Sequence, residues 1–186
     1  MMSVPIWRCM NPKLKLIGAS LLTALVLAFL LSRVFSGFQW ESEPELEGLI
    51  PVTLDRVIDG DTIKVFLPGG KRANVHFLGI DTPEMNYGKD EPPEPLAEEA
   101  TRFTEEMLAR KRITIETDVE KRDRYERILA YVWVDIGGVP VMVNEALLME
   151  GLADIRIYEP NVKYYDRLAA ALDEAREAGR GLWSAE

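Results

Sequence analysis

Residues 77–84 read FLGIDTPE and follow His76, the only histidine of the chain. The first half is an apolar run of the kind that forms a buried strand. The second half is an acid, a Thr-Pro step and a second acid, and Pro83 ends the strand because it has no backbone N–H to donate. The stretch therefore predicts a core strand whose end carries two carboxylates, Asp81 and Glu84.

Turn signals on either side of this stretch predict a small sheet. Residues 52–67 alternate in hydropathy around Asp59-Gly60-Asp61, and Asp-Gly is a strong signal for a tight turn between two strands. Pro68-Gly69-Gly70 predicts the next turn. The strands expected are two within 52–67, one at 72–80, one at 113–117 and one at 128–134.

Helical patterns follow the third strand. The first, from about residue 95, has acids in its first turns and Arg110-Lys111-Arg112 at its end. A short second helix at 146–150 is expected to be capped by Asn144 and ended by Gly151, and a third runs from about 162 to 178. These elements predict a mainly β fold, a five-stranded Greek-key barrel of the oligonucleotide-binding type with three α-helices.

The N-terminal region, residues 1–40, has the pattern of a membrane-targeting segment. Residues 16–32 carry no charge and follow three basic residues, which favours an N-terminus inside the cell and a domain outside. The run is at the short end of the roughly 17–25 residues that span a bilayer. We expect either an uncleaved anchor in the cell membrane or a signal peptide cut near Val34-Phe35-Ser36, which would give a secreted protein. Arg33 favours the anchor.

The rest of the chain is acidic. Residues 41–48 include Pro44 and lack periodicity, which predicts a linker before a domain at 49–186. Residues 1–40 hold four of the 22 Lys and Arg residues and no acid, so residues 41–186 hold 18 basic and 31 acidic side chains, a net charge of −13. Nucleic acid binding depends mostly on neutralising phosphates, so such a partner would need a local basic site and a metal ion. Residues 110–127, with seven basic and five acidic side chains, are locally basic.

Three short motifs could carry chemistry, although each taken alone also fits an ordinary surface turn. Carboxylates at adjoining strand ends, from Asp59-Gly60-Asp61 and Asp81-Thr82-Pro83-Glu84, would suit a hard cation such as Ca²⁺. The third motif, Arg124-Tyr125-Glu126-Arg127, precedes a strand, and arginine binds phosphate through two parallel hydrogen bonds.

The order and spacing of VIDGDTIKV, FLGIDTPE, DRYERILAYVWV, VNEALLMEGLA and a terminal GLWS resemble the staphylococcal nuclease (thermonuclease-like) family over about residues 51–184. The resemblance implies an OB-fold barrel with three helices and Ca²⁺-dependent hydrolysis of phosphodiester bonds in DNA, RNA or both. It implies metal ligands at Asp61, Asp81 and the Thr82 carbonyl, a general base at Glu84, a catalytic arginine at Arg127, and nucleotide contacts at Arg124, Tyr125 and Tyr158.

One position departs from the family pattern. The family has a second catalytic arginine five residues before the strand-end aspartate, where this chain has His76. Arg72 lies roughly 13 Å away along the strand and cannot take its place. An imidazole offers at most two donors and is only partly charged near neutral pH. We expect a monomeric endonuclease whose turnover His76 could lower; the alternative is a catalytically weak domain of the same fold that binds nucleic acid or a protein partner.

Overall fold

The computed structural model describes residues 46–88 and 91–184. The apolar run at 16–32 and the possible cleavage site at 34–36 therefore lie outside the described residues. No helix within the described ranges is long and apolar enough to cross a membrane.

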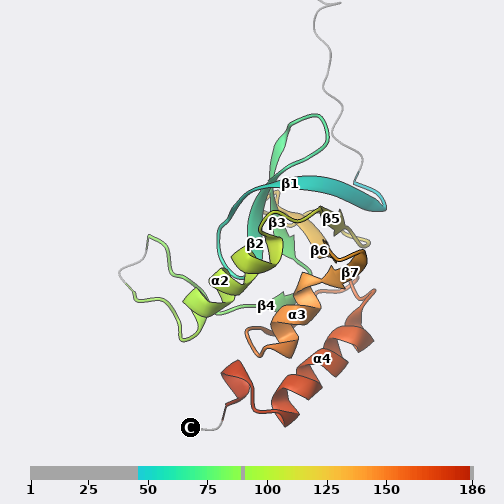
Figure 1. The fold of residues 1–186 in the computed structure, drawn as a ribbon. Coiled ribbons are helices and arrows are strands. Elements are labelled where there is room, and N and C mark those ends of the chain that lie inside the picture. Colours follow the sequence, from blue (N-terminus) through green and yellow to red (C-terminus); the bar gives the residue numbers. More distant parts are fainter. Residues whose placement is uncertain (1–45, 89–90, 185–186) are drawn as a thin grey trace, which may run out of the picture. The chain divides into compact units, whose positions relative to one another are not determined.

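The described strands form a closed barrel, a hairpin extension and a second small sheet (Figure 1). They are β1 (Leu49–Val57), β2 (Thr62–Phe66), β3 (Arg72–Phe77), β4 (Gly79–Asp81), β5 (Ile113–Glu116), β6 (Ile128–Ile136), β7 (Val139–Met142) and β8 (Asp154–Arg156). The main sheet has the order β3-β2-β1-β5-β6-β7, and a parallel pairing of β3 with β6 closes its first five strands into a barrel. The predicted five-stranded barrel is confirmed, with β7 and the β4–β8 pair added to it.

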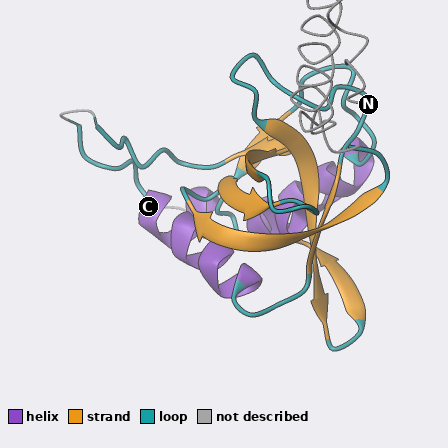
Figure 2. Cartoon of the chain, turned by 90° about the horizontal axis from the view of Figure 1, so that it is seen from above, coloured by secondary structure: helices purple, strands orange, loops and turns teal. Residues whose placement is uncertain are grey.

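Three α-helices and a short 3₁₀-helix accompany these strands in the described part of the chain (Figure 2). They are α2 (Ala97–Leu108), α3 (Val143–Met149), α4 (Tyr165–Glu177) and η2 (Gly181–Trp183). Alternate strand residues such as Ile63, Val65, Val75 and Phe77 fill the barrel, as period-2 patterning requires. The three predicted helices are confirmed.

The predicted strand at 72–80 is in fact two strands, because the chain turns at Gly79. Gly79 has φ +80°, a backbone conformation that residues other than glycine rarely adopt. A Cβ at this position would lie 2.5 Å from Leu168 Cδ1 on α4. Leu78 still donates its N–H to the carbonyl of Ala130 in the barrel (2.9 Å). From Gly79 onward the chain instead pairs with β8, so this glycine transfers the strand from the barrel to the second sheet.

Asn144 does not cap α3, contrary to the sequence prediction. The helix begins at Val143, one residue before Asn144, and Asn144 is fully buried. Its side-chain oxygen accepts a hydrogen bond from the N–H of Val132 (2.9 Å). Its amide nitrogen donates to the carbonyl of Leu78 (2.9 Å). Buried backbone groups need hydrogen-bond partners, and Asn144 supplies them to both segments. Its side chain thereby links β6 to the residue that follows β3, where the chain leaves the barrel.

Candidate active site

The turn between β1 and β2 is packed tightly against its surroundings. A Cβ on Gly60 would lie 2.7 Å from Thr82 Oγ1 and 2.8 Å from Ala100 Cβ. The Gly60 carbonyl accepts a hydrogen bond from Thr104 Oγ1 at 2.6 Å. The turn is therefore held between α2 and the segment after β4, which fixes the position of the acids on either side of Gly60.

Asp61 is buried at this turn and ionised. Its carboxylate accepts hydrogen bonds from Thr62 Oγ1 (3.0 Å) and from the Thr82 N–H (3.1 Å), and His76 Nδ1 lies 3.2 Å from it. Burial raises the pKa of Asp61, but the bonds from His76, Thr82 and Thr62 outweigh burial and hold the pKa below its ordinary value. A fixed negative charge therefore lies directly beside His76.

Asp59 adds a second carboxylate at this turn. We call the group formed by Asp59, Asp61, Asp81 and Glu84 the acidic rim. Burial, followed by the charge of Asp61, raises the pKa of Asp59 to about 7, and Glu84 contributes in the same direction. The carboxylates of Asp59, Asp61 and Glu84 therefore lie close enough together for their charges to repel one another. A cation would relieve that repulsion.

Asp81 and Glu84 complete this rim; Asp81 is the last residue of β4, and Glu84 lies in the turn that follows. Asp81 Oδ2 accepts a hydrogen bond from Arg156 Nη1 at 2.5 Å. The Glu84 side chain is exposed, while its backbone is held by Glu94, whose carboxylate accepts from the Glu84 N–H (2.9 Å) and whose N–H donates to the Glu84 carbonyl (3.0 Å). Glu84 therefore presents a carboxylate to solvent from an ordered turn.

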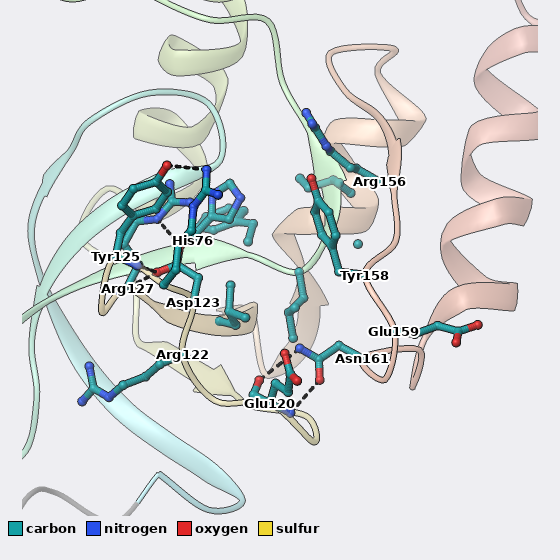
Figure 3. A pocket seen from close by; sticks show the side chains of 16 residues that line it. His76, Glu120, Arg122, Asp123, Tyr125, Arg127, Arg156, Tyr158, Glu159 and Asn161 are labelled. Carbon is teal, nitrogen blue, oxygen red and sulfur yellow. Dashed lines mark hydrogen bonds and ion pairs between the residues drawn. The ribbon is translucent and has the colours of Figure 1, made fainter.

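A pocket of about 490 Å³ lies beside the rim, since its lining residues His76 and Arg156 contact Asp61 and Asp81. Figure 3 shows the side chains that line this pocket. Its lining has more arginines than acids, in contrast to the acidic domain as a whole. The charged lining residues are Arg122, Arg124, Arg127, Arg156, Glu120, Asp123 and Glu159, and the residues with a ring are His76, Phe77, Tyr125 and Tyr158. This composition suits an anionic ligand with flat groups such as bases.

Asp123 holds the conformation of the 124–127 loop, which carries Arg124 and Arg127. Its carboxylate accepts from the backbone N–H groups of Tyr125 (2.8 Å) and Arg127 (3.0 Å) and from Arg127 Nε (2.6 Å). Burial raises the pKa of Asp123, but these bonds hold the pKa below its usual range. Arg127 Nε is therefore engaged, and the N–H groups of its two Nη atoms remain to bind a ligand.

Tyr125 is flanked by cationic side chains. The Arg124 guanidinium lies 4.7 Å and the Arg127 guanidinium 5.6 Å from the centre of its ring. Arg124 Nη2 also lies 2.6 Å from the Tyr125 hydroxyl. Stacking of this kind limits the rotamers of both arginines, so their charges are oriented before a ligand arrives.

The residues predicted from the sequence fall into two groups. Those that line the pocket are His76, Arg124, Tyr125, Arg127 and Tyr158. Those at the acidic rim are Asp61, Asp81, Thr82 and Glu84. Two contacts join the pocket to the rim: one between the predicted residues His76 and Asp61, and one from Arg156, another pocket-lining residue, to Asp81.

Two residues of the site were missed by the sequence analysis. Asp123 stands four residues before Arg127, and that spacing was the available signal for an ion pair. Arg156 is on β8, and its contact with Asp81 depends on a strand pairing that the sequence patterns do not reveal. Arg72, considered for the second arginine, lies outside the pocket lining, with its guanidinium near Asp55 (3.8 Å) and over the ring of Phe66 (4.9 Å).

Comparisons with known proteins bear on this site. The model of the family described as "Staphylococcal nuclease homologue" matches residues 74–185, a range that includes every residue lining the pocket. The thermonuclease of Staphylococcus hyicus is 41% identical over 129 residues, which cover 69% of this chain and 73% of that protein. Endonuclease YncB of Bacillus subtilis (strain 168) is 41% identical over 138 residues, 73% of this chain and 63% of YncB. The thermonuclease of Staphylococcus intermedius is 38% identical over 128 residues, 69% of this chain and 73% of that protein.

Proposed function

This chain belongs to the staphylococcal nuclease family, and we propose that it hydrolyses phosphodiester bonds of DNA, RNA or both with Ca²⁺ as its cofactor. The observation that carries the proposal is the junction of an arginine-lined pocket with a rim of carboxylates. Hydrolysis needs both: cations to bind the phosphate, and a carboxylate to activate water.

Each side chain has a role that its contacts support. Water attacks phosphorus and negative charge gathers on the non-bridging oxygens, then the P–O bond to the leaving sugar oxygen breaks and that oxygen takes a proton from solvent. Glu84, exposed on an ordered turn, would take the proton of the attacking water. Arg127, held through Nε by Asp123, would donate its Nη hydrogens to the phosphate oxygens. Arg124 and Tyr125 would bind a neighbouring phosphate, and Tyr158 would lie beside the nucleotide.

The rim suits a calcium ion by its chemistry. We propose Asp61, Asp81 and the Thr82 carbonyl as the ligands, all of them the oxygen donors that Ca²⁺ prefers. Burial, followed by repulsion from Asp61, raises the pKa of Asp59 to about 7, and the repulsive part of that effect also favours a cation there. Within 46–88 and 91–184 no group of three or more His, Cys, Asp and Glu side chains is arranged to hold a metal ion, and we propose that water and substrate oxygens complete the shell. The bound ion would supply positive charge to the phosphate.

The alternative function is a domain that binds nucleic acid or a protein partner with little catalysis. One observation favours it: His76 occupies the position of the second family arginine, and its Nδ1 faces Asp61 and Thr62. That nitrogen is therefore not available to a phosphate in this arrangement.

One assay separates the two functions. The full-length protein is incubated with end-labelled single-stranded DNA and RNA, in Ca²⁺ and in excess chelator, beside Asp61→Asn as the control. Cleavage that requires Ca²⁺ and Asp61 supports the nuclease. Binding without cleavage under both conditions supports the alternative, and full cleavage in chelator contradicts the calcium role.

We also propose that residues 1–40 hold the domain at the outer face of the cell membrane, because a basic stretch precedes the uncharged run at 16–32. Retention in the membrane fraction after alkaline extraction is expected. A soluble product beginning near Gly37 would instead establish a cleaved signal peptide and a secreted enzyme.

A further inference from the structure

Arg156 lies on the same face of the second sheet as Asp81. Gly79 pairs with Arg156 in the antiparallel β4–β8 ladder, and Asp81 pairs with Asp154. Arg156 and Asp81 are therefore diagonal neighbours, and such pairs lie within reach of long side chains. The bond from Arg156 Nη1 to Asp81 Oδ2 follows from this register.

The same guanidinium lines the pocket. Figure 3 shows Arg156 and Tyr158 on the side of the pocket opposite to Tyr125, Arg127 and His76. The Arg156 side chain is 53% exposed, against 28% for Arg127, so it is the more accessible of the two cations. Its guanidinium lies 5.7 Å from the centre of the Tyr158 ring, which limits its movement.

Arg156 has donors to spare for a phosphate. A guanidinium carries five N–H donors in a planar fork, and the Asp81 bond is made by Nη1. Exposed ion pairs are weak, so a phosphate can share or replace the carboxylate at little cost. By contrast His76, with an 18% exposed side chain and Nδ1 directed at Asp61, is poorly placed to supply a second cation.

We infer that Arg156 is a phosphate-binding residue of this pocket and supplies, from β8, the second guanidinium that His76 does not provide. The inference rests on the proposed nuclease function. The substrate phosphate lies between Arg156 and Arg127, and Arg156 also orients Asp81 while the pocket is empty. Two guanidinium groups, Arg127 from the loop before β6 and Arg156 from β8, thereby bind one phosphodiester.

The test compares Arg156→Gln and Arg156→Lys with a matched control, Arg167→Gln. Arg167 also pairs with a carboxylate, Glu145, and lies 5.3 Å from the centre of an aromatic ring, that of Trp133, but it is not among the residues that line the pocket. Its side chain is 42% exposed, close to the value for Arg156. All are made in the full-length protein, and unfolding curves show whether each variant is folded.

The first readout is binding without metal. A fluorescent single-stranded oligonucleotide with hydrolysis-resistant phosphorothioate linkages is titrated in chelator at several salt concentrations. For a single strand, loss of one phosphate contact makes the negative slope of log K (K being the association constant) against log salt shallower by about 0.7. We expect that change for Arg156→Gln, partial recovery for Arg156→Lys because it keeps the charge, and the wild-type slope for Arg167→Gln.

The second readout is turnover with Ca²⁺. Arg156→Gln should lower kcat by about 10²-fold, the usual loss for one donor to a transition-state oxyanion. A wild-type slope and kcat in Arg156→Gln would overturn the inference and leave the nuclease function standing. A wild-type slope with only a changed Ca²⁺ requirement would also overturn it, because Arg156 would then serve Asp81 alone. Neither binding nor cleavage by the wild type would overturn the nuclease function and this role together.

Discussion

Gly79→Ala tests whether the turn within FLGID directs the chain from the barrel to the site. The new methyl group would meet Leu168 Cδ1 at 2.5 Å on a backbone with φ +80°. The left-handed conformation costs about 1–2 kcal/mol for an L-residue. Overpacking a filled core costs typically about 1–3 kcal/mol. We therefore expect the free energy of unfolding to fall by about 2–5 kcal/mol, the sum of the two costs.

Denaturant unfolding of Gly79→Ala and Gly69→Ala measures these two contributions separately. Gly69 has φ +87°, but a Cβ added there would have no other atom within 4 Å, so its variant should lose only the conformational part, about 1–2 kcal/mol. Adding Leu168→Ala removes the clash, so the double variant should be less destabilised than the sum of the single ones. Equal losses at both glycines, or strict additivity with Leu168→Ala, would refute the steric explanation of the strand break.

Three further predictions concern the site and its support. Glu84→Gln should leave the unfolding curve unchanged and lower kcat by about 10²–10⁴-fold, the usual effect of losing a general base; unchanged turnover would remove Glu84 from the mechanism. With Arg156 present, His76→Arg should raise kcat by no more than about tenfold, whereas in Arg156→Gln it should raise kcat by about 10²-fold, the value of one restored donor; equal gains in both backgrounds would contradict this. Burial raises the pKa of Glu116, but the hydrogen bond from Lys163 and those from the other partners of Glu116 hold the pKa below the ordinary 4.5. This carboxylate therefore stabilises the fold above pH 4.5, and that stability is lost as the pH falls through the pKa of the folded state. Lys163→Met should reduce that acid-side loss in unfolding free energy, and an identical pH profile would contradict the role of Lys163.

The barrel and the helices could be predicted because their signals are local. Alternation and the Asp-Gly and Pro-Gly-Gly turns lie within the strands or next to them, and tertiary packing agreed with them. The break at Gly79 could not be predicted in this way, since it depends on the pairing with β8 and on Leu168 of α4, which leaves no room for a side chain there; both are distant in the sequence. Asn144 was misread for the same reason: asparagine favours caps in general, but here two buried backbone groups need its amide.

The site was predictable only as far as its motifs are contiguous. The spacing of the motifs predicted the site residues at strand ends and in the 124–127 loop. Five of the predicted residues line one pocket. Arg156 escaped notice because its partner Asp81 is 75 residues away and the register of a three-residue strand carries almost no hydrophobic pattern. His76 was identified as the departure from the family, yet its contact with Asp61 required the β2–β3 pairing.

The acidity of the domain has a different meaning once these contacts are known. A net charge of −13 over residues 41–186 argues against a polyanion ligand if all acids are counted alike. Two of the acids, however, hold the arginines of the pocket: Asp123 bonds Arg127 Nε, and Asp81 bonds Arg156 Nη1. Each bond engages one nitrogen of its guanidinium and leaves the other donors for a ligand. For Arg127, whose side chain is only 28% exposed, the bond also reduces the ordering cost that phosphate binding would otherwise carry. Binding should then depend on a few oriented arginines rather than on net charge, which is why a change at one of them is expected to matter more than a change in overall composition.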